Sequence, residues 1–222
     1  MRAYLAILGK DVRQELRTKE MITAMAVFAL LVMLIFNFAL GIGHTDKNTL
    51  AAAVLWVAFT FAGTLGLNRS MSQERAGESL RGLLLCPVDR SVIFLAKATA
   101  NLIFMLAVEL VAIPVAIILF NLKLVPSMVW LPLVLFLGSL GFATVGTVFA
   151  TMATGTRARD WLLPLLLLPI EIPVIIGAVQ ATATILTGEP PTNAGMGFNL
   201  LVACDVIYLA VCYVLFEYAV EV

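Results

Sequence analysis

Six long apolar runs, separated by short charged stretches, dominate this sequence of 222 residues. A helix needs about 20 mostly apolar residues to cross the hydrocarbon core of a membrane. We place the spans at 21–43, 49–67, 98–120, 127–154, 160–187 and 198–219. None of these runs shows the short alternating strands of a membrane β-barrel. The predicted fold is therefore an all-α integral membrane protein with six transmembrane helices.

The composition agrees, since 62% of residues are hydrophobic, 13% are charged and the mean hydropathy is +1.04. Soluble globular domains lie far from these values. About twenty residues that include charges precede the first apolar run, and no small-residue cleavage site follows it. We therefore expect no cleaved signal peptide, and the first span stays in the membrane.

Lysine and arginine are distributed unevenly although the formal net charge is zero. Five lie in the N-terminal segment, five lie in the loop 68–97, and Arg157 and Arg159 lie in the fourth connection. Only Lys47 and Lys123 fall on the other side. Basic residues in short loops are retained in the cytoplasm. We therefore expect a multi-pass protein with both termini and the loop 68–97 in the cytoplasm.

The N-terminal segment 1–20 has the pattern of an amphipathic helix. At helical spacing, one stripe carries Tyr4, Leu5, Leu8, Val12 and Leu16, and basic residues lie around the other side. Glu15 interrupts the stripe. We predict an interfacial helix whose basic face contacts anionic membrane lipid. A solvated cytoplasmic tail is the alternative.

The loop 68–97 contains a second helical pattern. After Gly77, leucines recur at 80, 83 and 84, and Pro87 ends the run because proline pushes the preceding residue out of the α region. This predicts a helix of two or three turns, too short to be stable alone in water. It would dock on the bundle or on a partner, although interfacial loop helices without any partner are also common. The segment from Val92 leads into the third span, with Lys97 at its cytoplasmic edge.

These residues carry a resemblance to a known family. The spacing Glu74-x-x-Gly77-x-x-Leu80-x-x-Leu83-x-x-x-Pro87, followed by Lys97, resembles the coupling segment of ABC-2 type exporter permeases. More narrowly, LWVAFTFAGTLGLNRSMSQERAGESLRGLLLCPVDRSVIFLAK and the later ARDWLLPLLLLPIEIPVII resemble the CcmB family, the permeases of cytochrome c maturation, often called haem exporters. The similarity covers most of the chain, including its length, its six spans and the order of motifs.

The resemblance implies one permease domain over 1–222, in a bacterial inner membrane, that forms a homodimer and binds two copies of the ATPase CcmA. It further implies CcmC and CcmD as membrane partners that handle haem, and CcmE as the haem chaperone. The loop 68–97 would be a coupling loop whose leucines are buried in the ATPase and whose charges orient it. The residues implied are Glu74, Gly77, Glu78, Leu80, Arg81, Leu83, Leu84 and Pro87.

The chain lacks the sequence needed to bind ATP through a Walker A motif. Its only Gly-Lys pair is Gly9-Lys10, and Tyr4 stands where the first glycine should be. We therefore expect ATP to be bound by a partner and the chain not to be an enzyme. The spans offer no nucleophile beside a base, no histidine cluster and no paired carboxylates at catalytic spacing, so an intramembrane enzyme is disfavoured. We expect no metal, no cofactor and no nucleic acid bound by the chain, and haem handled only by the complex.

Small residues recur at every fourth position of the fourth span: Ser139, Ala143, Thr147 and Thr151, with Gly138, Gly141 and Gly146 beside them. Small side chains let helix backbones approach closely. The pattern indicates a packing face, within the subunit or at a dimer contact, and we favour the former.

The fifth span contains Pro164, Pro169 and Pro173. Proline removes a backbone donor and clashes with the preceding turn. We predict a kinked or broken helix whose outer part, about 172–186, folds back at the external face. The resemblance implies the same, because a re-entrant turn closes the outer mouth of ABC-2 type exporters.

Three acidic residues fall within spans: Glu109, Glu171 and Asp205. Charge at the bilayer centre is costly, so such residues face the interior, pair or stay protonated. For Glu171, which lies between Pro169 and Pro173, a gate on a translocation route and a structural hydrogen bond stay equally open. For Glu109 and Asp205 we favour a structural hydrogen bond.

His44 is the only histidine and lies in the first external loop. Imidazole is a haem ligand, but one histidine in a polar loop is more often solvated, which we favour. Two other functions stay open for the whole chain. It could be an ABC-2 permease for a drug, lipid or polysaccharide, or a membrane assembly scaffold without transport.

Overall fold

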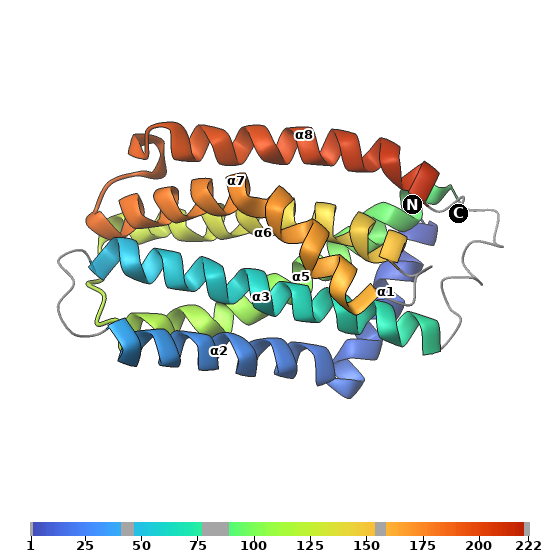
Figure 1. The fold of residues 1–222 in the computed structure, drawn as a ribbon, viewed down its shortest axis with the longest axis horizontal. Helices are drawn as coiled ribbons and strands as arrows, with labels where there is room; N and C mark the ends of the chain where they lie inside the picture. Colours follow the sequence, from blue (N-terminus) through green and yellow to red (C-terminus); the bar gives the residue numbers. More distant parts are fainter. Residues whose placement is uncertain (1, 41–46, 77–88, 154–158, 220–222) are drawn as a thin grey trace.

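The computed structural model describes residues 2–40, 47–76, 89–153 and 159–219, and within these ranges it contains only helices and their connections (Figure 1). The α-helices are α1 (Arg2–Thr18), α2 (Glu20–Leu40), α3 (Lys47–Ala76), α5 (Arg90–Leu119), α6 (Leu131–Ala153), α7 (Arg159–Thr187) and α8 (Met196–Ala219). Two short 3₁₀ helices, η1 (Pro126–Trp130) and η2 (Pro191–Asn193), precede α6 and α8.

Six of these segments are long and apolar enough to cross a membrane, which confirms the six predicted spans. They are Glu20–Ala39, Lys47–Ser70, Arg90–Leu119, Pro126–Met152, Leu163–Thr187 and Met196–Phe216. In Figure 1 the helices α2, α3, α5, α6, α7 and α8 run side by side, while α1 crosses one end of the bundle. The start of α1, the end of α3, the start of α5 and the end of α8 all lie at that end. The start of the first described helix and the end of the last one therefore lie on one side of the bundle.

The helices α3 and α6 form the interior of the bundle. In each, 72% of the residues in the spanning window are buried, against 22% in α2 and in α8. The small residues of α6 make this possible, because Gly138 lies against the Trp56 ring of α3 and Gly146 lies against Leu67 of the same helix. Ser139 and Thr147 are fully buried. The packing face predicted on the fourth span therefore packs within the subunit.

The third span begins earlier than predicted. The helix α5 starts at Arg90, so Lys97 lies two turns inside it rather than at its edge, and only 3% of Lys97 is exposed. A lysine there would be costly without an anionic partner. Asp11 of α1 supplies that partner, because its Oδ2 lies 2.7 Å from Lys97 Nζ.

The predicted break in the fifth span is wrong. The helix α7 is continuous from Arg159 to Thr187 with all three prolines inside it, so 172–186 does not fold back. Membrane helices tolerate proline where neighbouring helices satisfy the freed carbonyl groups. Beside the freed carbonyl of Pro169, the Tyr208 hydroxyl of α8 donates to the Ile170 carbonyl.

The outer half of α7 is held in place by two further contacts. Trp56 Nε1 on α3 donates to Thr182 Oγ1 at 2.9 Å. The Ser127 hydroxyl in η1 donates to the Ile185 carbonyl at 2.6 Å. These bonds fix the outer end of α7 against the bundle.

Candidate functional site

The predicted coupling segment lies between α3 and α5, mostly outside the described residues. Gly77, Glu78, Leu80, Arg81, Leu83, Leu84 and Pro87 are outside them, as are His44 and Cys86. Glu74 lies on α3, although its side chain is not described. The contact between this segment and an ATPase therefore stays a prediction.

The helices on either side of this segment are described. With 30 residues, α3 is about 45 Å long, which exceeds the roughly 30 Å of a bilayer core. Its last turn and a half, beyond Ser70, therefore extends past the candidate span, which ends there. The first turns of α5 are well packed, since Ile93 and Phe94 are fully buried.

A polar contact joins α1 to the start of α5. Besides the ion pair of Lys97 with Asp11, the Tyr4 hydroxyl donates to Thr99 Oγ1 at 3.0 Å. Asp11 also lies 3.0 Å from the Lys10 ammonium and is 12% exposed. Ile7 is buried in the same contact region of α1. The helix α1 is thus attached to the helix that follows the predicted coupling segment.

The apolar stripe predicted on α1 divides into two parts. Tyr4, Leu8 and Val12 pack against the bundle, whereas Leu5 and Leu16 are 60% and 61% exposed. On a helical wheel the exposed pair lies between the packed face and the basic face. This arrangement suits a helix at a membrane surface, with one face on the protein, one toward lipid hydrocarbon and one toward headgroups.

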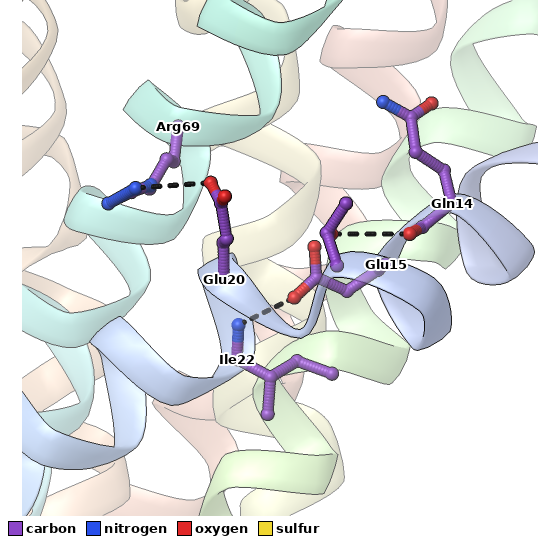
Figure 2. A network of polar contacts seen from close by, with 6 residues as sticks. Gln14, Glu15, Glu20, Ile22 and Arg69 are labelled. Atoms are coloured by element: carbon purple, nitrogen blue, oxygen red, sulfur yellow. Dashed lines mark hydrogen bonds and ion pairs between the residues drawn. The ribbon is translucent and has the colours of Figure 1, made fainter.

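Glu15, which interrupted the predicted stripe, shapes the turn between α1 and α2. Its Oε1 accepts a hydrogen bond from the Ile22 N–H at 2.9 Å, in the first turn of α2 (Figure 2). Lys19 lies between the two helices in the left-handed region with φ of 54°. Next to it, Arg69 of α3 pairs with Glu20 of α2 at 3.3 Å (Figure 2). A carboxylate that satisfies free N–H groups at a helix start stabilises that start.

The three acidic residues of the spans are all buried, with at most 3% exposure. Glu109 of α5 accepts a hydrogen bond from the Ser139 hydroxyl of α6, as expected for a structural role. Asp205 of α8 lies against Gly141 of α6, and neither of its oxygens accepts a hydrogen bond from a described residue. The backbone of Gly141 is the group closest to this carboxylate, so a structural role of Asp205 stays a prediction.

Glu171 of α7 is 0% exposed, and both of its oxygens also lack a hydrogen-bond donor among the described residues. It lies close enough to Asp205 for their charges to repel when both are ionised. An ionised carboxylate without a partner is very unfavourable in a membrane interior. The pair is therefore suited to hold at least one proton or to accept a donor from outside the chain.

Glu171 also lines a cavity of about 10 Å³ with Trp56, Thr60 and Met105. About 10–15 Å³ accommodates one water molecule. The described residues contain no group of three His, Cys, Asp or Glu side chains that could hold a metal ion. This site can thus hold protons and a single water molecule.

Sequence reasoning missed two polar pairs that join helices. One is Lys97 with Asp11, and the other is Asn101 with Thr147, whose Nδ2 and Oγ1 atoms are 2.9 Å apart between α5 and α6. The sequence signal for both pairs is that Lys97 and Asn101 lie one helical turn apart at the start of an apolar run. Their partners could be identified only from the tertiary structure.

Six spans packed around a largely apolar core that contains a few polar pairs, with α1 across one end, define a multi-pass, all-helical membrane protein. The family model described as CcmB protein matches residues 2–222. The chain therefore belongs to the CcmB family.

Several curated relatives have the same name, Heme exporter protein B. The relative from Bradyrhizobium diazoefficiens is 28% identical over 211 residues, which cover 95% of this chain and 94% of that protein. The relative from Rhodobacter capsulatus is 28% identical over 171 residues, or 77% and 78% of the two chains. The relative from Pseudomonas aeruginosa is 28% identical over 195 residues, or 86% and 85%.

Proposed function

We propose that this chain is the membrane permease subunit of an ABC transporter complex for cytochrome c maturation. ATP hydrolysis in a separate subunit would drive haem export or the release of a haem-loaded chaperone. The observation that carries this proposal is the CcmB family match over residues 2–222, together with relatives named Heme exporter protein B. The six-span bundle and the resemblance of the loop 68–97 to a coupling segment support it.

The proposed complex contains a homodimer of this chain, the ATPase CcmA, the membrane proteins CcmC and CcmD, and the haem chaperone CcmE. It lies in the bacterial inner membrane, with both termini of this chain in the cytoplasm. The location of the start of α1 and the end of α8 at one side of the bundle supports this orientation, as does the concentration of lysine and arginine at that side.

The proposed coupling path begins at the segment between α3 and α5. Glu74, Gly77, Glu78, Leu80, Arg81, Leu83, Leu84 and Pro87 would contact the ATPase. Movement of this segment would be transmitted to α5, because Ile93 and Phe94 in the first turns of α5 are fully buried in the bundle. Through Lys97 and Asp11, α1 would move together with α5.

The proposed response in the membrane occurs at Glu171. Its carboxyl group is buried on a helix that carries Pro169 and Pro173 beside it, and it lacks a hydrogen-bond donor among the described residues. A small change in the position of α7 relative to α8 would change what this group contacts. Glu171 would thereby act as a gate residue or a polar contact on the translocation route.

The test is co-purification of the permease with its ATPase. Replacing Leu80, Leu83 and Leu84 by alanine should abolish co-purification while membrane insertion stays normal. The matched control is Leu5→Ala with Leu16→Ala, which removes two exposed leucines at the same end of the bundle and should leave ATPase binding unchanged. Retained ATPase binding with normal ATP turnover in the triple variant would contradict the coupling assignment.

A second measurement separates haem handling from the other candidate functions. ATP-dependent release of haem-loaded CcmE from the purified complex should require this chain. Transport of a drug, lipid or polysaccharide instead would identify a different ABC-2 permease. Normal complex assembly and chaperone release without any ATP hydrolysis would identify a scaffold.

A further inference from the structure

A groove follows the outer surface of the turn between α1 and α2. Its volume is about 550 Å³, and α2 and α3 form its walls. We call it the elbow groove. Its polar end is lined by Thr18, Lys19, Glu20, Thr23 and Arg69, and its apolar end by Val27, Phe28, Leu31 and Leu65. The groove therefore has the two-part character of an amphiphile-binding site.

The polar end of the elbow groove carries a net positive charge. It contains two cations, Lys19 and Arg69, and one carboxylate, Glu20, which Arg69 already binds. Glu15, the other nearby carboxylate, is buried and accepts a hydrogen bond from the start of α2 (Figure 2). Arg69 remains 44% exposed, so its further N–H groups can reach a second anion. This end is complementary to a phosphate group.

The apolar end is complementary to a hydrocarbon chain. Val27 and Leu31 are 51% and 53% exposed on the outer surface of a membrane span. Leu31 is eleven residues beyond Glu20 on one helix, which corresponds to about 16 Å at 1.5 Å per residue. One leaflet contributes about 15 Å of hydrocarbon. The groove thus extends from headgroup depth through roughly one leaflet.

We propose that the elbow groove binds one anionic phospholipid, with its phosphate at Lys19 and Arg69 and an acyl chain along Phe28 and Leu31. This goes beyond the proposed transport function, because the lipid would fix the angle between α1 and α2. Its headgroup would bridge the turn at Lys19 and the last third of α3 at Arg69. Among the described residues, those that line the groove include no His, Cys, Met or Tyr, so a haem iron would find none of its usual ligands in this lining.

Native mass spectrometry of the purified full-length chain tests this proposal. The protein is titrated with phosphatidylglycerol and, separately, with phosphatidylcholine of the same acyl chains. One basic residue near an anionic lipid changes affinity by about fivefold. The first phosphatidylglycerol should therefore bind at least about fivefold more tightly than phosphatidylcholine.

Three variants locate the bound lipid. Lys19→Gln should reduce the preference for phosphatidylglycerol by about fivefold. Lys123→Gln, which removes another exposed charge, at the other end of the bundle, should not change it. Val27→Trp fills the apolar end without changing any charge and should abolish the tight phosphatidylglycerol adduct. Each variant should remain monodisperse with unchanged helical content, because all three positions are exposed.

Four results would overturn the proposal. The first is equal binding of the two lipids, and the second is an equal loss with Lys123→Gln and Lys19→Gln. The third is displacement of phosphatidylglycerol by equimolar haem, which would identify a porphyrin site. The fourth is a dimer that Val27→Trp dissociates, which would mean that a second copy of the chain covers the groove.

Discussion

The buried polar side chains between α5 and α6 have hydrogen-bond partners, whereas the buried carboxyl groups of α7 and α8 have none among the described residues. Between α5 and α6, Asn101 bonds Thr147 and Glu109 bonds Ser139, so both helices contribute one partner to each pair. Between α7 and α8, Glu171 and Asp205 are equally buried, but neither receives a hydrogen bond from a described residue.

This difference separates a structural contact from a candidate functional one. Polar pairs between membrane helices stabilise a fixed arrangement. Buried carboxyl groups without partners destabilise the resting structure unless they are protonated or bind something else. We therefore expect substitutions at α5–α6 to change stability, and substitutions at Glu171 to change function without lowering stability.

We expect the largest loss of stability from a substitution that separates α7 from α8. It tests whether these two helices are packed as closely as α5 and α6. A Cβ at Gly177 would lie 2.7 Å from the Gly197 carbonyl oxygen, which is backbone and cannot move aside. Gly177→Leu should lower the free energy of unfolding by about 3 kcal/mol, the upper range for overpacking. Gly9→Leu is the control, because no atom lies within 4 Å of a Cβ at Gly9. Similar thermal unfolding in detergent for both variants would mean that α7–α8 is loosely packed.

The next effect concerns the ion pair that joins α1 to α5. Asp11→Ala should cost about 2 kcal/mol, less than the 3–5 kcal/mol of a fully buried pair, because Asp11 is 12% exposed. It leaves the buried Lys97 ammonium without the carboxylate of Asp11. Lys97→Met removes the buried charge itself and should be close to neutral. Thermal unfolding of the two variants measures the asymmetry, and equal losses would show that the pair itself is strongly stabilising.

A smaller effect measures the hydrogen bond between α5 and α6. A double-mutant cycle of Asn101→Ala and Thr147→Val should give a coupling energy of about 1 kcal/mol, within the range for polar pairs between membrane helices. Unfolding in a denaturing detergent provides the measurement. Strictly additive effects would remove the distinction between the two helix contacts.

We expect the smallest changes in stability from substitutions of two buried carboxyl groups, Glu109 and Glu171. Glu109→Leu leaves the Ser139 hydroxyl without its acceptor and should cost about 1 kcal/mol. Glu171→Leu breaks no described hydrogen bond and should leave stability unchanged or slightly higher. The same Glu171 variant should lower ATP-dependent release of the haem-loaded chaperone. A stability loss at Glu171 as large as at Glu109 would assign it a purely structural role.

Much of the fold could be predicted because its determinants are local. Span length and apolarity follow from consecutive residues, and all six spans were found within a few residues except the start of α5. The small residues of α6 from Gly138 to Thr151 also predicted close packing within the subunit. For the candidate site, the burial of Glu109, Glu171 and Asp205 followed from the cost of exposing them to lipid.

The sequence by itself determined that this chain crosses the membrane six times and which helix carries the packing face. Only the tertiary structure decided the partners of its polar groups. Lys97 lies inside α5 with Asp11 as its partner. The helix α7 runs through three prolines without a break and receives hydrogen bonds from α3, η1 and α8. Glu171 and Asp205 have no side-chain hydrogen-bond partner among the described residues. Hydrogen bonds and ion pairs depend on which groups lie within about 3 Å of each other, and that distance is set by helix packing rather than by position along the chain.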